Sequence, residues 1–145
     1  MRGGDGPAFM CGWCNGAPGI GLARLGTLPL LDDARVREEI QAAVNVTRTT
    51  GFGYKHGLCH GDLGNVLFLL EAARVLRDDA LLRHTYRLAG GILQDINEHG
   101  DRHGLPESIE TPGLMVGLAG IAYGLARLAA PERVPDILAV APPMG

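Results

Sequence analysis

Three residues with the chemistry of metal ligands occur at matching places in this chain. Cys14 and Cys59 each lie two residues before a Gly-x-x-Gly motif, and His60 directly follows Cys59. Cysteine sulfur and imidazole nitrogen are preferred donors for zinc, and three such ligands leave a fourth position open for chemistry. The pattern therefore indicates a catalytic Cys₂His zinc site, provided that the fold brings together residues 45 positions apart.

Each of these residues also has an ordinary interpretation when taken alone. A free cysteine before a helix is often a small buried hydrophobe, and a histidine beside a glycine turn often caps a helix or faces solvent. Neighbouring side chains on a continuous helix point about 100° apart. At a turn, which Gly61 permits, Cys59 and His60 can both reach one ion. The recurrence of cysteine at one place in the repeat favours the metal interpretation.

Two further polar residues lie close to the Cys-His pair. His56, four residues before His60, is our candidate catalytic residue, as a proton donor. It can equally orient a ligand or be a polar loop residue. Asp62 stands at a predicted helix start, where the helix dipole favours a carboxylate, and this role is favoured over catalysis.

Cys11 and Trp13 flank the first ligand. Cys11 and Cys14 form a C-x-x-C pair, but a redox motif of this kind needs a strand–helix context, and the sequence predicts no strands. We therefore interpret Cys11 as structural. Trp13 is either a packing residue beside the site or a generic buried aromatic.

The Gly-x-x-Gly motif occurs three times, and an apolar run follows each copy. Such self-similarity indicates stacked supersecondary units, in which equivalent positions lie at the same end. The runs predict apolar helices over residues 20–31, 63–76 and 114–128.

Two amphipathic helices are predicted between the apolar ones. The Asp pairs at 32–33 and 78–79 supply N-caps, because their carboxylates accept hydrogen bonds from free backbone N–H groups. Apolar residues follow each pair at helical spacing and leave the opposite face polar. They are Val36, Ile40, Ala43, Val44 and Thr47, then Leu81, Thr85, Leu88 and Ile92. We expect His84 on the solvated face, and we assign no role to His99 and His103, which flank the following loop.

The order of these helices predicts an all-α architecture. A helix that is apolar on every side must be covered on every side, which favours an inner layer of apolar helices within an outer layer of amphipathic ones. Three such units form an arc with two exposed ends. We therefore expect a piece of a larger closed ring.

Length and charge exclude several functional classes. The 145 residues suit one domain, which we place at 11–145 after an irregular lead-in at 1–10. The net charge of −3 and the lack of a Lys/Arg cluster argue against nucleic acid. Residues 113–126 carry no charge but are shorter than the roughly 20 apolar residues of a membrane span. Three cysteines without an apolar signal region suggest reduced thiols in the cytoplasm.

Residues 13–20 read WCNGAPGI and resemble the W-C-x-G-x-P-G-I signature of the LanC-type lanthionine cyclases. Residues 58–65, LCHGDLGN, resemble the C-H-G signature of that family, and residues 112–121, PGLMVGLAGI, resemble its final inner helix. The resemblance covers nearly the whole chain. It is closest to the C-terminal cyclase domain of the bifunctional class II synthetases, LanM.

The resemblance implies an α/α toroid with about seven inner helices, of which this chain would supply the last three. It implies a Zn²⁺ ion at one end, held by Cys14, Cys59 and His60. The implied reaction adds a cysteine thiolate of a dehydrated precursor peptide to dehydroalanine or dehydrobutyrine, which gives lanthionine or methyllanthionine. The implied partners are the lanthipeptide precursor and the missing N-terminal part of the synthetase, or another chain.

The sequence departs from the family pattern in two ways. Asn15 stands where His or Tyr is expected, and the acid/base His and Asp of the upstream repeats have no matching positions. Two alternatives to an active cyclase therefore stay open. One is a non-catalytic fragment that binds zinc and thiol peptides. The other is an inactive truncated remnant, whose exposed apolar edge predicts aggregation.

Overall fold

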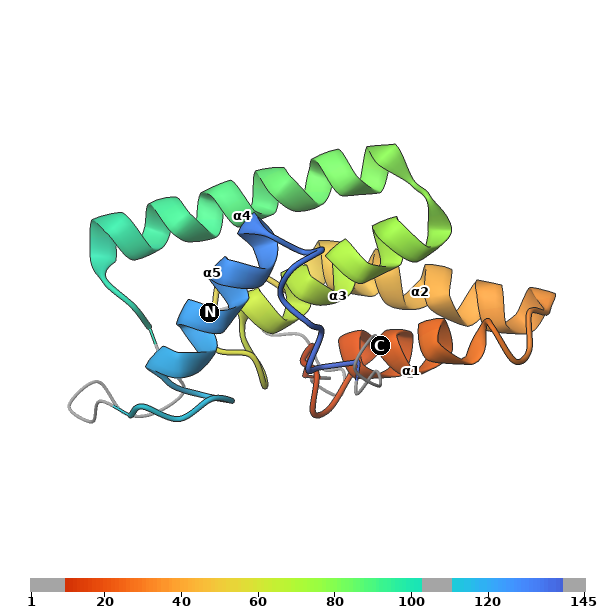
Figure 1. The fold of residues 1–145 in the computed structure, drawn as a ribbon, viewed down its shortest axis with the longest axis horizontal. Helices are drawn as coiled ribbons and strands as arrows, with labels where there is room; N and C mark the ends of the chain where they lie inside the picture. The colour runs from red at the N-terminus through yellow and green to blue at the C-terminus, as the bar shows by residue number, and fades with distance from the viewer. Residues whose placement is uncertain (1–9, 103–110, 140–145) are drawn as a thin grey trace, which may run out of the picture.

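The computed structural model describes residues 10–102 and 111–139, and every element of secondary structure in these ranges is helical (Figure 1). This confirms the all-α prediction. The five helices are α1 (Ala17–Thr27), α2 (Ala34–Thr50), α3 (Asp62–Leu76), α4 (Asp79–His99) and α5 (Leu118–Ala129).

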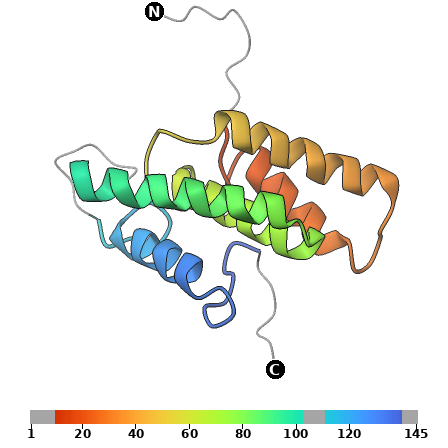
Figure 2. The same ribbon diagram turned by 90° about the horizontal axis from the view of Figure 1, so that it is seen from above.

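Helix α3 lies at the centre and contacts each of the other four helices. Helices α1 and α5 flank it, α2 packs against α1, and α4 packs against α3. In Figure 2, α2 and α5 lie at opposite margins, with α3 and α4 between them. The apolar helices thus form an inner row and the amphipathic ones lie outside it, as predicted for an arc of an α/α toroid.

The two amphipathic helices begin where their caps were predicted. The Asp33 carboxylate accepts a hydrogen bond of 2.8 Å from Val36 N, and the Asp78 carboxylate accepts one of 2.9 Å from Leu81 N. Each bond satisfies one of the N–H groups that a helix start leaves unpaired. Residues of the predicted apolar faces, such as Ile40 and Val44 of α2 and Ile92 of α4, are buried, and these helices pack against α1 and α3.

Among the helices of the described ranges, the central inner helix α3 is the one covered on all sides. Its residues 62–70 are all buried, whereas Ile20 of α1 and Leu118 of α5 are exposed. The predicted all-round burial is therefore wrong for α1 and α5, because each has an inner neighbour on one side only. The exposed side of α1, which carries Ile20, matches the open end expected for an arc of repeats.

The predicted bounds of α1 and α5 are also shifted. Helix α1 begins earlier than predicted, because Pro18 fits the first turn. It ends at Thr27, whose carbonyl accepts from both Leu30 N and Leu31 N. Helix α5 begins at Leu118 instead of residue 114, because Leu118 N donates to Thr111 O and a loop precedes it.

The repeated Gly-x-x-Gly motif has a steric cause. At both glycines of each copy, an added Cβ would lie within 2.5 Å of the carbonyl oxygen six residues earlier. No side chain fits at that distance, so each loop folds tightly onto the start of its own helix only with glycine there. The pairs are Gly16–Met10, Gly19–Trp13, Gly61–Lys55, Gly64–Leu58, Gly117–Thr111 and Gly120–Leu114.

Other expectations have mixed outcomes. His84 is half-buried, and its Nε2 has no hydrogen-bond partner within the described residues, so the prediction of a solvated side chain is wrong. Burial, together with Arg48 and Arg87, lowers its pKa. His103 and residues 1–9 of the predicted lead-in lie outside the described ranges. Within those ranges, no helix has the length and hydropathy to cross a membrane.

Candidate metal centre

Backbone hydrogen bonds join the loops of the three repeats in a row. The residues two positions before the motifs are Cys14, Cys59 and Met115. Cys14 N donates to Cys59 O at 3.2 Å, and Cys59 N donates to Met115 O at 2.9 Å. Equivalent positions therefore lie at one end of the inner row, as the repeat predicted.

This row brings the three predicted ligands together. The two Sγ atoms and an imidazole nitrogen of Cys14, Cys59 and His60 all lie within 4.8 Å of one another. Zn–S bonds near 2.3 Å and Zn–N bonds near 2.0 Å place tetrahedral ligand atoms about 3.5–3.8 Å apart. Small side-chain rotations therefore suffice to surround one ion. The donor set fits zinc with an open fourth position.

The Cys59 thiol is held in its protonated form when no cation is present. Burial, followed by the hydrogen bond with Cys14, raises its pKa to about 11. Two cysteine sulfurs side by side cannot both become thiolates without a compensating positive charge. A bound divalent cation supplies that charge, so the pair is suited to a metal and poorly suited to a free nucleophile.

The three repeats are not chemically equivalent at this end. His60 corresponds to Asn15 in the first repeat and to Val116 in the third, and Met115 replaces the cysteine there. The donors therefore come from two adjacent repeats. Neither Met115 nor Val116 adds a nitrogen or thiolate donor, which is consistent with three protein ligands.

Asn65 links the loops that carry the ligands. It is 1% exposed, and its Nδ2 donates to Cys11 O at 3.0 Å and to Gly51 O at 2.6 Å. It thus holds the segment before Cys14 against the segment before Cys59. Sequence reasoning missed this residue, although an asparagine within an otherwise apolar helix was an available signal.

Asp62 closes the loop that leads to Cys59. Its carboxylate accepts hydrogen bonds from Gly53 N at 3.0 Å and from Tyr54 N at 3.4 Å. Burial raises its pKa, while these bonds act in the opposite direction. Asp62 lies in the first turn of α3, as predicted, but its hydrogen bonds go to the preceding loop, a structural role that the sequence pattern did not indicate.

His56 is fully buried, and both of its ring nitrogens have partners. Nδ1 accepts a hydrogen bond of 2.8 Å from Arg102 N, so the proton of the neutral ring lies on Nε2. Nε2 then donates to Asp95 Oδ2 at 2.9 Å. These bonds tie the loop before Cys59 to the outer helix α4. Nothing in the sequence pattern of α4 pointed to Asp95 as a partner.

Asp95 is expected to stabilise the fold at neutral pH, and acid should remove this stabilisation. The hydrogen bond with His56, followed by that from Arg102, lowers the Asp95 pKa. Its stabilising contribution is therefore present above the unfolded value of about 3.9 and is lost as the pH falls through the lower folded value. We expect Asp95→Asn to melt below the wild type at pH 7, and this difference to shrink between pH 4 and 2. Thermal unfolding followed by circular dichroism tests this.

The control is Glu98→Gln, which removes another carboxylate from the same helix. Its melting temperature should follow the pH profile of the wild type. An Asp95→Asn profile parallel to the wild type over the whole acid range would show that Asp95 makes no such contribution.

Residues 2–139 match the family described as lanthionine synthetase C-like protein. The chain belongs to this family. It is also 28% identical over 131 residues to the lacticin 481/lactococcin biosynthesis protein LcnDR2 of Lactococcus lactis subsp. lactis. The aligned region covers 79% of this chain and 14% of that relative. The resemblance stated from the motifs is thereby confirmed, for a chain that spans about one seventh of its relative.

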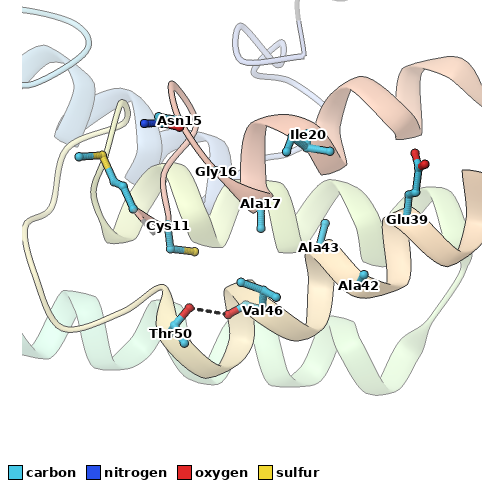
Figure 3. Close-up of a pocket in the computed structure, with 11 residues that line it drawn as sticks. Cys11, Asn15, Gly16, Ala17, Ile20, Glu39, Ala42, Ala43, Val46 and Thr50 are labelled. Carbon is cyan, nitrogen blue, oxygen red and sulfur yellow. Dashed lines mark hydrogen bonds between the residues drawn. The ribbon is translucent and has the colours of Figure 1, made fainter. Parts of the chain in front are cut away.

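In this lanthionine synthetase C-like chain, Cys11 lies apart from the ligand cluster. Within the described residues, the only such Cys/His/carboxylate cluster contains Cys14, Cys59 and His60. The Cys11 side chain instead points into an apolar groove between α1 and α2 (Figure 3). The structural role expected for Cys11 agrees with this position.

The groove beside Cys11 has a volume of about 810 Å³. Small residues of both helices, Ala17, Ala42 and Ala43, contribute to its lining, as do the exposed side chains of Ile20 and Val46. Small side chains let another element approach the helix backbones closely. The groove lies at the α1–α2 end of the arc of helices, away from α5.

Proposed function

We propose that this chain is the zinc-binding part of a lanthionine cyclase, which closes thioether rings in a dehydrated precursor peptide. The observation that carries the proposal is the meeting of Cys14, Cys59 and His60 from two repeats of a lanthionine synthetase C-like fold. A Cys₂His set with an open position is a donor arrangement of catalytic zinc.

Cys14, Cys59 and His60 would hold a zinc ion, whose positive charge would lower the pKa of a nearby peptide thiol. In the net reaction the peptide thiol gives up its proton. Its sulfur forms a bond to the β-carbon of a dehydroalanine or dehydrobutyrine. The α-carbon takes up a proton as the carbon–carbon double bond becomes single. Cys14, Cys59 and His60 would hold the metal in the position that orients the peptide thiol for this addition.

We assign His56 a positioning role in place of the proton transfer predicted from the sequence. Its ring is fully buried, and both nitrogens are occupied by Asp95 and the Arg102 backbone. Such a residue is suited to fixing the loop of Cys59 and His60. The proton donor for the α-carbon would then come from another part of the synthetase or from water.

We further propose that the groove between α1 and α2 receives another helical repeat of the same kind. The backbone row that runs from Met115 through Cys59 to Cys14 would continue there, with the Cys14 carbonyl as the next acceptor. The small residues of the groove permit such close packing, and the relative is about seven times longer than the aligned region. The partner that we propose for this groove is an upstream part of a synthetase.

The test measures zinc content and ring formation on the same preparation. We expect about one zinc per chain by elemental analysis. A dehydrated precursor peptide should lose its free thiol without a change in mass, and a chelator should abolish this reaction. A chain without zinc, or thioether formation that survives complete zinc removal, would contradict the proposal.

The same experiment decides the main alternative, a fragment that binds zinc and thiol peptides without turnover. We consider this alternative because the aligned region covers only 14% of the relative. Zinc binding and peptide retention without any loss of free thiol would support this alternative for the isolated chain. Ring formation by the isolated chain would rule it out.

A further inference from the structure

The residue before the first ligand is bonded to the far end of the described chain. Trp13 Nε1 donates a hydrogen bond of 3.0 Å to Leu138 O, across 125 positions of sequence. Leu138 itself is 3% exposed. The last described segment therefore reaches from α5 past the central helix to the loop of Cys14.

We name residues 131–139 the C-terminal strap. Arg127 of α5 is 5% exposed and donates to Pro131 O at 2.7 Å and also to Val134 O. Its guanidinium forms a further ion pair of 3.1 Å with Glu71 of α3. The first half of the strap is thus fixed to two inner helices through one buried cation.

The second half of the strap is fixed as well. The Tyr123 hydroxyl donates to Pro135 O at 2.6 Å and accepts from Ile137 N at 3.0 Å. The Asp136 carboxylate accepts from Leu138 N at 2.9 Å. These bonds set the direction of the Leu138 carbonyl that meets Trp13. These bonds therefore fix the position of the Leu138 carbonyl oxygen.

Cys14 needs such support more than the other two ligands do. It is exposed, whereas Cys59 and His60 are half-buried and follow a loop closed by Asp62. Its own hydrogen bond to Cys59 is comparatively long, at 3.2 Å. Its neighbour Trp13 has little freedom, since the Trp13 carbonyl packs against Gly19 and its indole is tied to the strap.

From this arrangement we propose that the C-terminal strap is a positioning element of the metal centre, which fixes Cys14 through the Trp13–Leu138 hydrogen bond. The inference rests on the proposed zinc site, because a metal ligand requires precise placement. Metal and catalytic sites need their groups held to within about 0.5 Å. The strap would connect the last repeat to a ligand of the first.

The decisive variant is Trp13→Phe, which removes the indole N–H and keeps an aromatic ring. In the metal-free chain, the Cys14 amide should exchange with deuterium roughly two- to tenfold faster, as the loss of one hydrogen bond implies. Zinc affinity, measured by competition with a chelator, should fall about tenfold. Leu30→Ala, which alters a side chain that is 89% exposed, should leave both values unchanged.

Tyr123→Phe is a second variant that loosens the strap without altering Trp13. It should shift both measurements in the same direction by a smaller factor, and it replaces Trp13→Phe if that variant does not fold. Unchanged amide exchange and unchanged zinc affinity in the folded variants would overturn the proposal. The exchange measurement needs no metal. Faster exchange of the Cys14 amide in a chain that binds no zinc would contradict the proposed function, but it would still support the link between the strap and Cys14.

Discussion

Cys59→Ala is expected to leave the chain without stoichiometric zinc and any synthetase carrying it without thioether formation. The substitution removes one of three donors, and the remaining Cys14 and His60 come from different repeats. Loss of a group that merely orients a ligand weakens metal binding about 10- to 100-fold. Loss of the ligand itself should exceed that range. Elemental analysis and chelator competition measure the effect, and mass spectrometry of thiol-alkylated peptide measures ring formation.

Cys11→Ala is the matched control for this experiment. Cys11 is a free cysteine three residues from Cys14, but its side chain points into the groove between α1 and α2 (Figure 3). It should keep the zinc content of the wild type. Equal zinc content in Cys59→Ala and Cys11→Ala would show that the cluster is not the metal site.

Gly64→Ala is expected to destabilise the fold by about 3 kcal/mol, at the upper end of overpacking effects. Its Cβ would lie 1.9 Å from the Leu58 carbonyl oxygen, and the obstacle is backbone that cannot rotate away. Helix α3 and the loop of Cys59 would have to separate, which disturbs the ligands as well. Urea unfolding followed by the helical circular dichroism signal measures the change.

The opposite result is expected for Gly90→Ala. Gly90 lies within helix α4, is exposed, and has open space where a Cβ would stand. Alanine there should stabilise the chain by about 0.5–1 kcal/mol, since glycine has the lower helix propensity. If both substitutions had the same sign and size, the steric explanation of the repeated motif would be wrong.

The features that could be predicted from sequence are the local and the periodic ones. Asp33 and Asp78 cap helices as expected, because capping depends on residues three positions apart. The meeting of Cys14 with Cys59 was predictable because a repeat places equivalent residues at the same end. Both inferences needed only short stretches of chain and one assumption about stacking.

The features that sequence missed depend on contacts between distant segments. Asp95 meets His56, and Leu138 meets Trp13, through the packing of α4 and α5 around α3. No periodicity encodes such pairs. The exposure of Ile20 was misjudged for a related reason, because burial of an apolar helix depends on how many neighbours it has. The amino-acid composition of a helix does not give the number of helices that pack against it.

The row of backbone bonds between repeats bears on how the molecule unfolds. In a stack of repeats, stability is nearly a sum of terms for each unit and for each junction between neighbours. A ligand that binds only the folded junction adds its binding free energy to that one term. An ion shared by Cys14 and Cys59 would therefore make the α1–α2 and α3–α4 units melt as a single cooperative block. The α5 unit, which offers Met115 at this end, contributes no ligand and would be coupled to that block only indirectly, through the Cys59–Met115 backbone bond and the Trp13–Leu138 bond of the C-terminal strap.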